Sequence, residues 1–313
     1  MILDALQTAK ILPYGLLADE IARLLQDASV QVPPRMVQSL PGGASLFAMP
    51  AHDAHLAITK LITFTPANAG TGRATIQGDV VVFDVATGER CLVLDGPTVT
   101  ARRTAAVTLL AAQKLAAAPL GPVLIIGAGV QGRAHLEALV VGLGVRQVFI
   151  HSRSASSAHA LAQHAHRLFA QLGITTGQAS AVASVADVLA QCPLVVTCTP
   201  ARAPVLDDPV LIHPQAFISA VGAFTPLMAE LAPSVVQHFA QRGAIVVDTA
   251  DAGHEAGDLL QAQIDVSACA TLQQTVLSSP LAKRTTLFKS CGWAGWDLAA
   301  ARLARQQIGV DAR

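Results

Sequence analysis

The chain has 313 residues, of which 52% are hydrophobic and 13% charged, with 21 basic and 21 acidic side chains. A neutral chain of this length has room for two domains and a large core, and it carries no overall basic field that would attract nucleic acid or an anionic membrane. Five scattered cysteines without a CxxC pair argue against a disulfide framework or a metal site, and no signal peptide or membrane-spanning run is recognisable, so we expect a soluble cytoplasmic protein.

The first third of the chain predicts an α+β domain. Residues 15–28 have the apolar spacing of a helix, and from about 44 to 95 short β-prone runs alternate with turn residues. The stretch "VATGER" (85–90) predicts a hairpin turn in which Gly88 has a positive φ. We therefore expect a largely antiparallel sheet.

A helix is expected next, within "DGPTVTARRTAAVTLL" (95–110). Thr100 is a plausible N-cap, which would put Arg102 and Arg103 in the first helical turn. The helix dipole disfavours cations there, so an inward arginine at this helix start indicates an anion site.

Two further cations are conspicuous. Lys60 alternates with apolar residues on a predicted strand, and Arg35 lies upstream in "VPPRMV". Each cation, taken alone, is as well explained by a solvated charge or a salt bridge at the edge of the core. Taken together with Arg103, they favour an anionic substrate.

From residue 119 onwards, strands and helices alternate, which predicts a parallel, doubly wound sheet. The expected strands are "VLIIG", "QVFIHS", "LVVTCT", "AFISAVG" and "AIVVDTA", with helices near 130–142, 155–171 and 184–191. After about 255 a helical stretch leads to a short strand, a turn and a final helix in "TTLFKSCGWAGWDLAAARLARQQ" (285–307).

A dinucleotide-binding loop is predicted between the first of these strands and its helix. Gly127, Gly129 and Gly132 form GxGxxG, which permits a tight turn, a close approach of the backbone to a pyrophosphate, and close helix–strand packing. The N–H groups at the start of the helix would then face the phosphates.

The next strand lacks the acid that NAD enzymes usually place at its end, about twenty residues after the loop. This position reads His151-Ser152-Arg153-Ser154. A hydroxyl and a guanidinium suit the 2′-phosphate of NADP(H), so we expect NADPH, with NADH weaker. The alternatives are that Arg153 is a solvated loop charge and that His151 is structural rather than stacked on adenine.

Five segments carry a resemblance to the ornithine cyclodeaminase/mu-crystallin family, in order and over nearly the whole chain. They are "DGPTVTARRTAAVTLLAAQKLA", "GAGVQGRAHLEAL", "SAVGAFTPLMAEL", "VVDTADAGHEAGDL" and "LFKSCGWAGWDLAAARLA". The resemblance implies an α/β fold in which an NADP-binding Rossmann domain (119–292) is inserted into a substrate-binding and dimerisation domain (1–118 and 293–313). It also implies a homodimer built through the N-terminal sheets.

The same resemblance implies where the substrate and cofactor bind. It assigns the substrate carboxylate to Lys60, Arg103 and Arg35. Independently of the resemblance, Asp297 at the start of the last helix is a candidate catalytic residue, although the favourable placement of an acid at a helix N-terminus is at least as good an explanation. Besides the glycine loop and the "HSRS" segment, we assign the cofactor to Thr104, Val130, Gln131, Thr199 and Gly222.

The branch of the family is indicated by two missing acids. The cyclodeaminase pattern has acids where this chain has Phe47 and Phe224, which we place beside the substrate. The chain therefore resembles the ketimine reductases, oxidoreductases that act on C=N groups. They convert Δ1-pyrroline-2-carboxylate to L-proline and Δ1-piperideine-2-carboxylate to L-pipecolate with NADPH. An amino-acid dehydrogenase, a cyclodeaminase or a non-enzymatic NADPH-dependent binding protein stays as an alternative.

Overall fold

The computed structural model describes residues 1–68, 70–278 and 283–311. The chain forms two compact units, of which unit 1 comprises Met1–Ala106 with Trp293–Arg313 and unit 2 comprises Val107–Gly292. The division falls inside the continuous helix α3 (Gly96–Leu115), whereas the boundary expected at residue 118 lies after the end of that helix. The expected α/β class, with one antiparallel and one parallel sheet, is confirmed.

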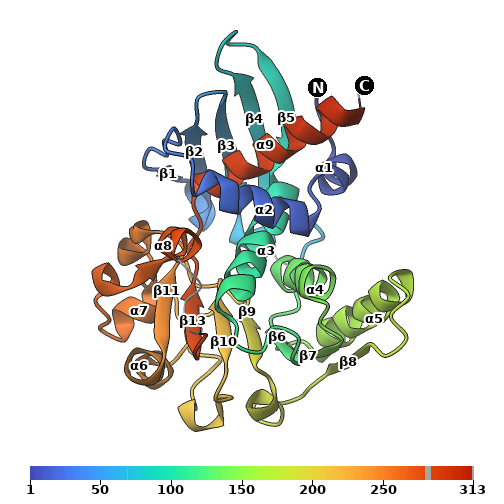
Figure 1. The fold of residues 1–313 in the computed structure, drawn as a ribbon, viewed down its shortest axis with the longest axis vertical. Helices are drawn as coiled ribbons and strands as arrows, with labels where there is room; N and C mark the ends of the chain where they lie inside the picture. Colours follow the sequence, from blue (N-terminus) through green and yellow to red (C-terminus); the bar gives the residue numbers. More distant parts are fainter. Residues whose placement is uncertain (69, 279–282, 312–313) are drawn as a thin grey trace. The chain divides into compact units, whose positions relative to one another are not determined.

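Unit 1 is a five-stranded antiparallel sheet whose strands follow one another in chain order (Figure 1). The strands are β1 (Met36–Ser39), β2 (Ser45–His52), β3 (Leu56–Phe64), β4 (Ile76–Asp84) and β5 (Arg90–Asp95). Its helices are α1 (Ala5–Ile11), α2 (Tyr14–Leu24) and α9 (Ala294–Asp311). The hairpin turn is confirmed, because Gly88 has φ of +72° between β4 and β5.

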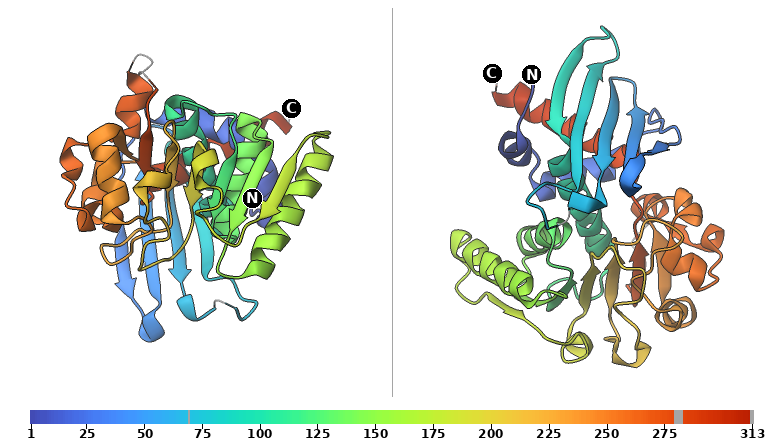
Figure 2. Two further views of the ribbon diagram at one scale, coloured as in Figure 1. Left: turned by 90° about the horizontal axis from the view of Figure 1, so that it is seen from below. Right: turned by 180° about the vertical axis from the view of Figure 1, so that it is seen from behind.

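Helix α9 packs on β2, β3 and β4 and against α2, so it covers one face of the sheet. Along β3 the side chains that alternate toward this face are Leu56, Ile58, Lys60 and Ile62, and all four are buried. Lys60 thus occupies a core position, where a charge is costly unless it is paired. Figure 2 shows the opposite face of the sheet, over which the described part of unit 1 places no helix.

Unit 2 is an eight-stranded parallel sheet with the order β12-β11-β13-β10-β9-β6-β7-β8. Its strands are β6 (Val123–Ile126), β7 (Gln147–His151), β8 (Gln178–Ala181), β9 (Leu194–Thr197), β10 (Phe217–Ala220), β11 (Ala244–Val247), β12 (Ala270–Thr271) and β13 (Thr286–Lys289). Its helices, besides the second half of α3, are α4 (Val130–Leu143), α5 (Ala155–Gln171), α6 (Pro233–Arg242), α7 (Gly257–Gln261) and α8 (Leu272–Leu277). The strand order reverses between β6 and β9, which is where doubly wound folds bind dinucleotides.

The structure adds two short strands to the expected elements, confirms a third and removes one expected helix. The short strands β8 and β12 were not predicted, and the short strand expected after 285 is β13, which lies between β10 and β11. The helix expected at 184–191 is only the 3₁₀ turn Leu189–Gln191. Here the Ser184 hydroxyl accepts a hydrogen bond from the Ala186 N–H, a local turn that competes with a helix.

The predicted start of α3 was also wrong. The helix begins at Gly96, and the Asp95 carboxylate accepts a hydrogen bond from the Thr98 N–H at 2.8 Å, which gives it the capping role assigned to Thr100. Arg103 therefore lies beyond the first turn, and the argument from the helix dipole does not apply to it.

No helix among the described residues is long and apolar enough to span a membrane.

Candidate functional site

The glycine loop of unit 2 has the shape that a pyrophosphate requires. Gly127 has φ of +110°, and a Cβ on Gly132 would lie 1.8 Å from the Gly127 carbonyl oxygen, so only glycine permits this approach of α4 to β6. A Cβ on Gly129 would meet nothing within 4 Å, and no side chain caps the N-terminus of α4. The loop therefore leaves open space in front of uncapped N–H groups, and a dinucleotide phosphate fits it.

The remaining loop residues differ in exposure. The Val130 side chain is exposed, whereas the Gln131 Oε1 is buried and has no hydrogen-bond partner among the described residues. The Gln131 carbonyl accepts a hydrogen bond from His135 Nδ1 at 2.8 Å, and Thr108 Oγ1 lies 3.0 Å from Nε2 of the same ring. Burial lowers the pKa of His135 to about 4, so this ring is neutral and braces the first turn of α4.

The "HSRS" segment follows β7 directly. The His151 carbonyl accepts a hydrogen bond from the Gly127 N–H at 2.9 Å, which joins the carboxyl ends of β6 and β7. Arg153 is exposed, and its guanidinium makes no ion pair among the described residues. Ser154 caps α5 by accepting a hydrogen bond from the Ser157 N–H at 3.2 Å, a structural role in addition to the cofactor contact expected of it.

A buried acid that the sequence analysis missed lies at the ends of β9 and β10. Glu230 is fully buried, and its carboxylate accepts hydrogen bonds from Thr199 and Gly222, two residues assigned to the cofactor. Burial raises the pKa of Glu230, although the Lys289 ammonium opposes the shift. The available signal was a lone charged residue within an apolar run, as in "LMAEL", and a second such residue is Lys289 in "TLFKS".

Unit 1 holds a buried cluster of cations around one acid. Lys60 Nζ lies 2.8 Å from Asp297 Oδ2, and Arg103 Nε lies 3.4 Å from Asp297 Oδ1, with all three side chains buried. Neither Asp297 oxygen makes a well-oriented hydrogen bond among the described residues, so these contacts are ion pairs. Burial lowers the pKa of Lys60 to about 8, Arg103 and Arg35 act in the same direction, and Asp297 opposes them.

This cluster brings together three residues that the sequence singled out separately, and it carries more positive than negative charge. It is a natural site for a small anion, because a bound carboxylate would neutralise the excess. Asp297 is the counter-ion of the cluster, in addition to its place in the first turn of α9.

The remaining residues that the sequence assigned to substrate or cofactor are Arg35, Phe47, Thr104 and Phe224. The Arg35 guanidinium lies 5.8 Å from the centre of the Phe47 ring, and both side chains are half-buried. Thr104 is buried, and its hydroxyl donates to the Thr100 carbonyl within α3. Phe224 belongs to unit 2 and is half-buried in the segment between β10 and α6.

Arg102 has a structural role. Its Nε donates to the Leu12 carbonyl at 2.6 Å, and its guanidinium lies 4.0 Å from the centre of the Tyr14 ring. Of the adjacent arginines in α3, only Arg103 belongs to the cation cluster.

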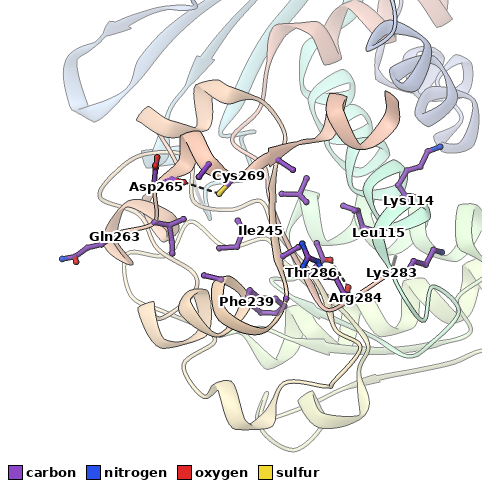
Figure 3. A pocket seen from close by; sticks show the side chains of 17 residues that line it. Lys114, Leu115, Phe239, Ile245, Gln263, Asp265, Cys269, Lys283, Arg284 and Thr286 are labelled. Atoms are coloured by element: carbon purple, nitrogen blue, oxygen red, sulfur yellow. Dashed lines mark hydrogen bonds between the residues drawn. The ribbon is translucent and has the colours of Figure 1, made fainter. Parts of the chain in front are cut away.

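Unit 2 also contains a cavity of about 690 Å³ lined by residues such as Phe239, Ile245 and Thr286 (Figure 3). Thr286 is the first residue of β13, and the wall also includes the residues that precede β11. The cavity therefore lies at the amino ends of these strands, whereas the glycine loop lies at a carboxyl end. It is not the dinucleotide site.

Comparisons with known proteins agree with this organisation. The model of the ornithine cyclodeaminase/mu-crystallin family matches residues 12–310. The chain is 39% identical to Delta(1)-pyrroline-2-carboxylate reductase 2 of Burkholderia ambifaria, over 99% of this chain and 96% of that protein. It is 37% identical to the Delta(1)-pyrroline-2-carboxylate/Delta(1)-piperideine-2-carboxylate reductase of Azospirillum brasilense, over 98% and 96%.

A solved structure shares the fold. The Delta(1)-pyrroline-2-carboxylate reductase of Thermococcus litoralis, in complex with NADH and L-proline, is similar with a TM-score of 0.83. The similarity covers 99% of this chain and 95% of that chain at 22% identity.

Proposed function

This chain belongs to the ornithine cyclodeaminase/mu-crystallin family, and from that premise we propose that it is an NADPH-dependent reductase of cyclic ketimines. Its substrates are Δ1-pyrroline-2-carboxylate and Δ1-piperideine-2-carboxylate, which it reduces to L-proline and L-pipecolate. The near full-length similarity to reductases of these two imines supports the assignment. The observation that carries it is the buried Lys60–Arg103–Asp297 cluster.

In this proposal the cluster anchors the substrate carboxylate. Lys60 and Arg103 bind its oxygens, and Arg35, whose charge already acts on Lys60, adds attraction from the half-buried edge. Fixing the carboxylate fixes the ring and thereby the face of C2 that is presented for reduction, which is an effect of orientation. Asp297 offsets part of the cationic charge, so that a protonated C=N nitrogen is tolerated near the cluster.

The glycine loop of unit 2 binds the dinucleotide, which supplies the hydride when bound. Gly127, Gly129 and Gly132 hold the pyrophosphate. Arg153 and Ser152 bind the 2′-phosphate. The exposed guanidinium supports this role because it has no acidic partner to displace within residues 1–68, 70–278 and 283–311. NADPH is therefore the preferred cofactor and NADH a weaker one.

The chain forms a homodimer through its antiparallel sheet. In the register of the sheet, Met36, Leu61 and Phe83 point away from the face that α9 covers, and all three are exposed. Exposed apolar residues gathered on one sheet face are typical of an interface. This face is therefore the one that a second copy covers.

The assignment is tested by following NADPH oxidation with each cyclic imine and with pyruvate plus methylamine. We expect rapid oxidation with the cyclic imines and slow oxidation with the acyclic mixture. Arg103→Ala should lower kcat/KM for both imines by at least about a hundredfold, since a buried charged partner of the carboxylate is lost, while NADPH binding stays intact.

The neighbouring Arg102→Ala serves as the matched control, because it removes an arginine from the same helix turn but leaves the cluster whole. It should lower thermal stability and leave the imine KM unchanged. Equal losses of kcat/KM in the two variants would mean that Arg103 is only a structural cation. Ammonia release from L-ornithine at a rate comparable to imine reduction would move the chain to the cyclodeaminase branch.

A further inference from the structure

One buried carboxylate ties together the ends of two adjacent strands of unit 2. Glu230 Oε1 accepts hydrogen bonds from the Thr199 N–H at 2.6 Å and the Thr199 hydroxyl at 2.8 Å. Glu230 Oε2 accepts from the Gly222 N–H at 2.7 Å and the Thr197 hydroxyl at 2.8 Å. A carboxylate offers about four acceptor positions, so Glu230 is saturated as the ionised form.

Glu230 is itself held by a second buried acid. Asp258 Oδ1 accepts from the backbone N–H groups of Glu230 and Leu231 at 2.6 and 2.9 Å, and Asp258 Oδ2 lies 2.7 Å from Lys289 Nζ. The Lys289 ammonium also donates to the Ala223 carbonyl at 2.5 Å. The acid is thus fixed through its backbone, and the chain on either side of Gly222 is fixed through the same network.

The two segments that Glu230 joins pack closely against each other at Gly222. A Cβ on Gly222 would lie 2.1 Å from the Thr199 carbonyl oxygen and 2.5 Å from Glu230 Oε1. The backbones after β9 and β10 are therefore in direct contact, with the carboxylate between their N–H groups. A shift of the Glu230 carboxylate would therefore displace at least one of them or break its hydrogen bond.

These segments lie on one side of the point where the strand order reverses. The glycine loop follows β6, and the "HSRS" segment follows β7 on the adenosine side. A dinucleotide crosses the reversal point, so its other half lies over the carboxyl ends of β9 and β10. Those ends are Thr197–Thr199 and the stretch up to Gly222.

We infer that Glu230 is a positioning residue for the nicotinamide half of the dinucleotide, acting through the backbones of Thr199 and Gly222. The inference rests on the proposed function, in that it requires a dinucleotide on the glycine loop. In this inference, different residues of unit 2 act on the two halves of the dinucleotide. The glycine loop and Arg153 hold the adenosine half, and Glu230 shapes the surface under the nicotinamide half.

Glu230→Gln isolates this role because it keeps the shape of the side chain. A hydroxyl can reverse and accept from the new amide NH₂, so Thr197 and Thr199 can adapt through their side chains. A backbone N–H cannot reverse, so in either orientation of the amide one N–H, that of Thr199 or that of Gly222, loses its acceptor. One of the two backbone segments is then released.

The experiment measures two dissociation constants without substrate, those of NADPH and of 2′,5′-ADP, which carries only the adenosine half. For Glu230→Gln we expect the Kd of NADPH to rise about tenfold to a hundredfold, since a buried N–H is left unpaired, while the Kd of 2′,5′-ADP stays within about twofold. A general loosening of unit 2 would weaken both ligands equally and would overturn the inference. So would an unchanged Kd for NADPH.

Two further variants keep the test decisive. Thr197→Val removes one donor to Glu230 from a fully buried side chain, and it should raise the NADPH Kd by a smaller factor without affecting 2′,5′-ADP. It also replaces Glu230→Gln if that variant does not fold, and an unaltered NADPH Kd then contradicts the inference. Glu137→Gln, which neutralises a carboxylate of α4 paired with Arg133 and His164, is the matched control and should leave both constants unchanged. If the unmodified protein binds neither ligand, the proposed function itself has failed.

Discussion

Lys60 is the residue whose protonation controls the proposed site. Its pKa is lowered from 10.5 to about 8 in the folded chain, because burial disfavours the ammonium form. In the proposed function this ammonium binds the substrate carboxylate, so kcat/KM for Δ1-pyrroline-2-carboxylate should fall above pH 8, by about tenfold per pH unit. Between pH 8 and 10.5 the unfolded chain holds the proton that the folded chain has lost, so the contribution of Lys60 to folding stability should increase with pH over the same window.

A pH–rate profile of Lys60→Arg provides the control for this prediction. Arginine keeps its charge throughout the range, so the fall above pH 8 should disappear or move to higher pH, and any limb that is left belongs to the imine itself. A variant profile identical to that of the unmodified enzyme would show that Lys60 does not titrate in the free site.

The proposed role of Arg153 predicts how the protein distinguishes the two nicotinamide cofactors. Arg153→Ala should raise the KM for NADPH by about tenfold to a hundredfold and leave the KM for NADH nearly unchanged, because only NADPH carries the 2′-phosphate. Steady-state kinetics with both cofactors provide the measurement. Equal use of NADPH and NADH by the unmodified enzyme would contradict the assignment of the "HSRS" segment.

At the scale of elements, substitutions of two glycines in the dinucleotide-binding loop should have different effects on stability. Gly132→Ala places a Cβ against the Gly127 carbonyl, so it pushes α4 away from β6 and should lower both the melting temperature and dinucleotide affinity. Gly129→Ala meets only open space in the protein, so the melting temperature should hold while the added methyl group obstructs the pyrophosphate. Calorimetry and a binding titration on both variants give the comparison. A similar loss of stability in both variants would mean that the open space at Gly129 is not a phosphate cradle.

The elements that could be predicted from the sequence are those with a strong local signal. Strands β6, β7, β9, β10 and β11 are apolar runs, and α4 and α5 follow clear turn or capping residues. Strand β12 has only two residues, and Asp95 outcompetes Thr100 as the cap of α3. A local sequence pattern does not decide which of two candidate residues caps a helix, and it does not detect a strand of two residues.

The candidate sites show the same limit. The glycine loop was predictable because its chemistry is contiguous in sequence. Glu230 was not, because its four donors come from the ends of two strands and only the tertiary structure brings them together. Lys60 and Asp297 could each be singled out as odd, but their pairing depends on the C-terminal helix covering β3.

At the scale of the whole molecule, the exposed sheet face of unit 1 predicts the oligomeric state. Light scattering coupled to gel filtration should give twice the mass of one chain. Leu61→Asp should shift the protein toward the monomer, because it places a charge in the centre of the proposed interface. Leu172→Asp is the control, since Leu172 is exposed to a similar extent, 45% against 47%, but lies at the end of α5 in unit 2. A monomeric unmodified protein, or equal effects of the two variants, would contradict the dimer.

The place of β13 has a consequence for how the chain is made. This strand lies between β10 and β11 and is followed at once by α9, the cover of the other sheet. During synthesis, β10 and β11 emerge long before β13, the strand that separates them. Until β13 is made, the edge of each strand that will pair with β13 stays unpaired. Neither unit can complete its hydrophobic core until β13 and α9 have left the ribosome. A nascent chain stalled before residue 286 should therefore bind chaperones and be cleaved readily by proteases. Chaperone binding and protease sensitivity should both disappear abruptly once β13 and α9 are released.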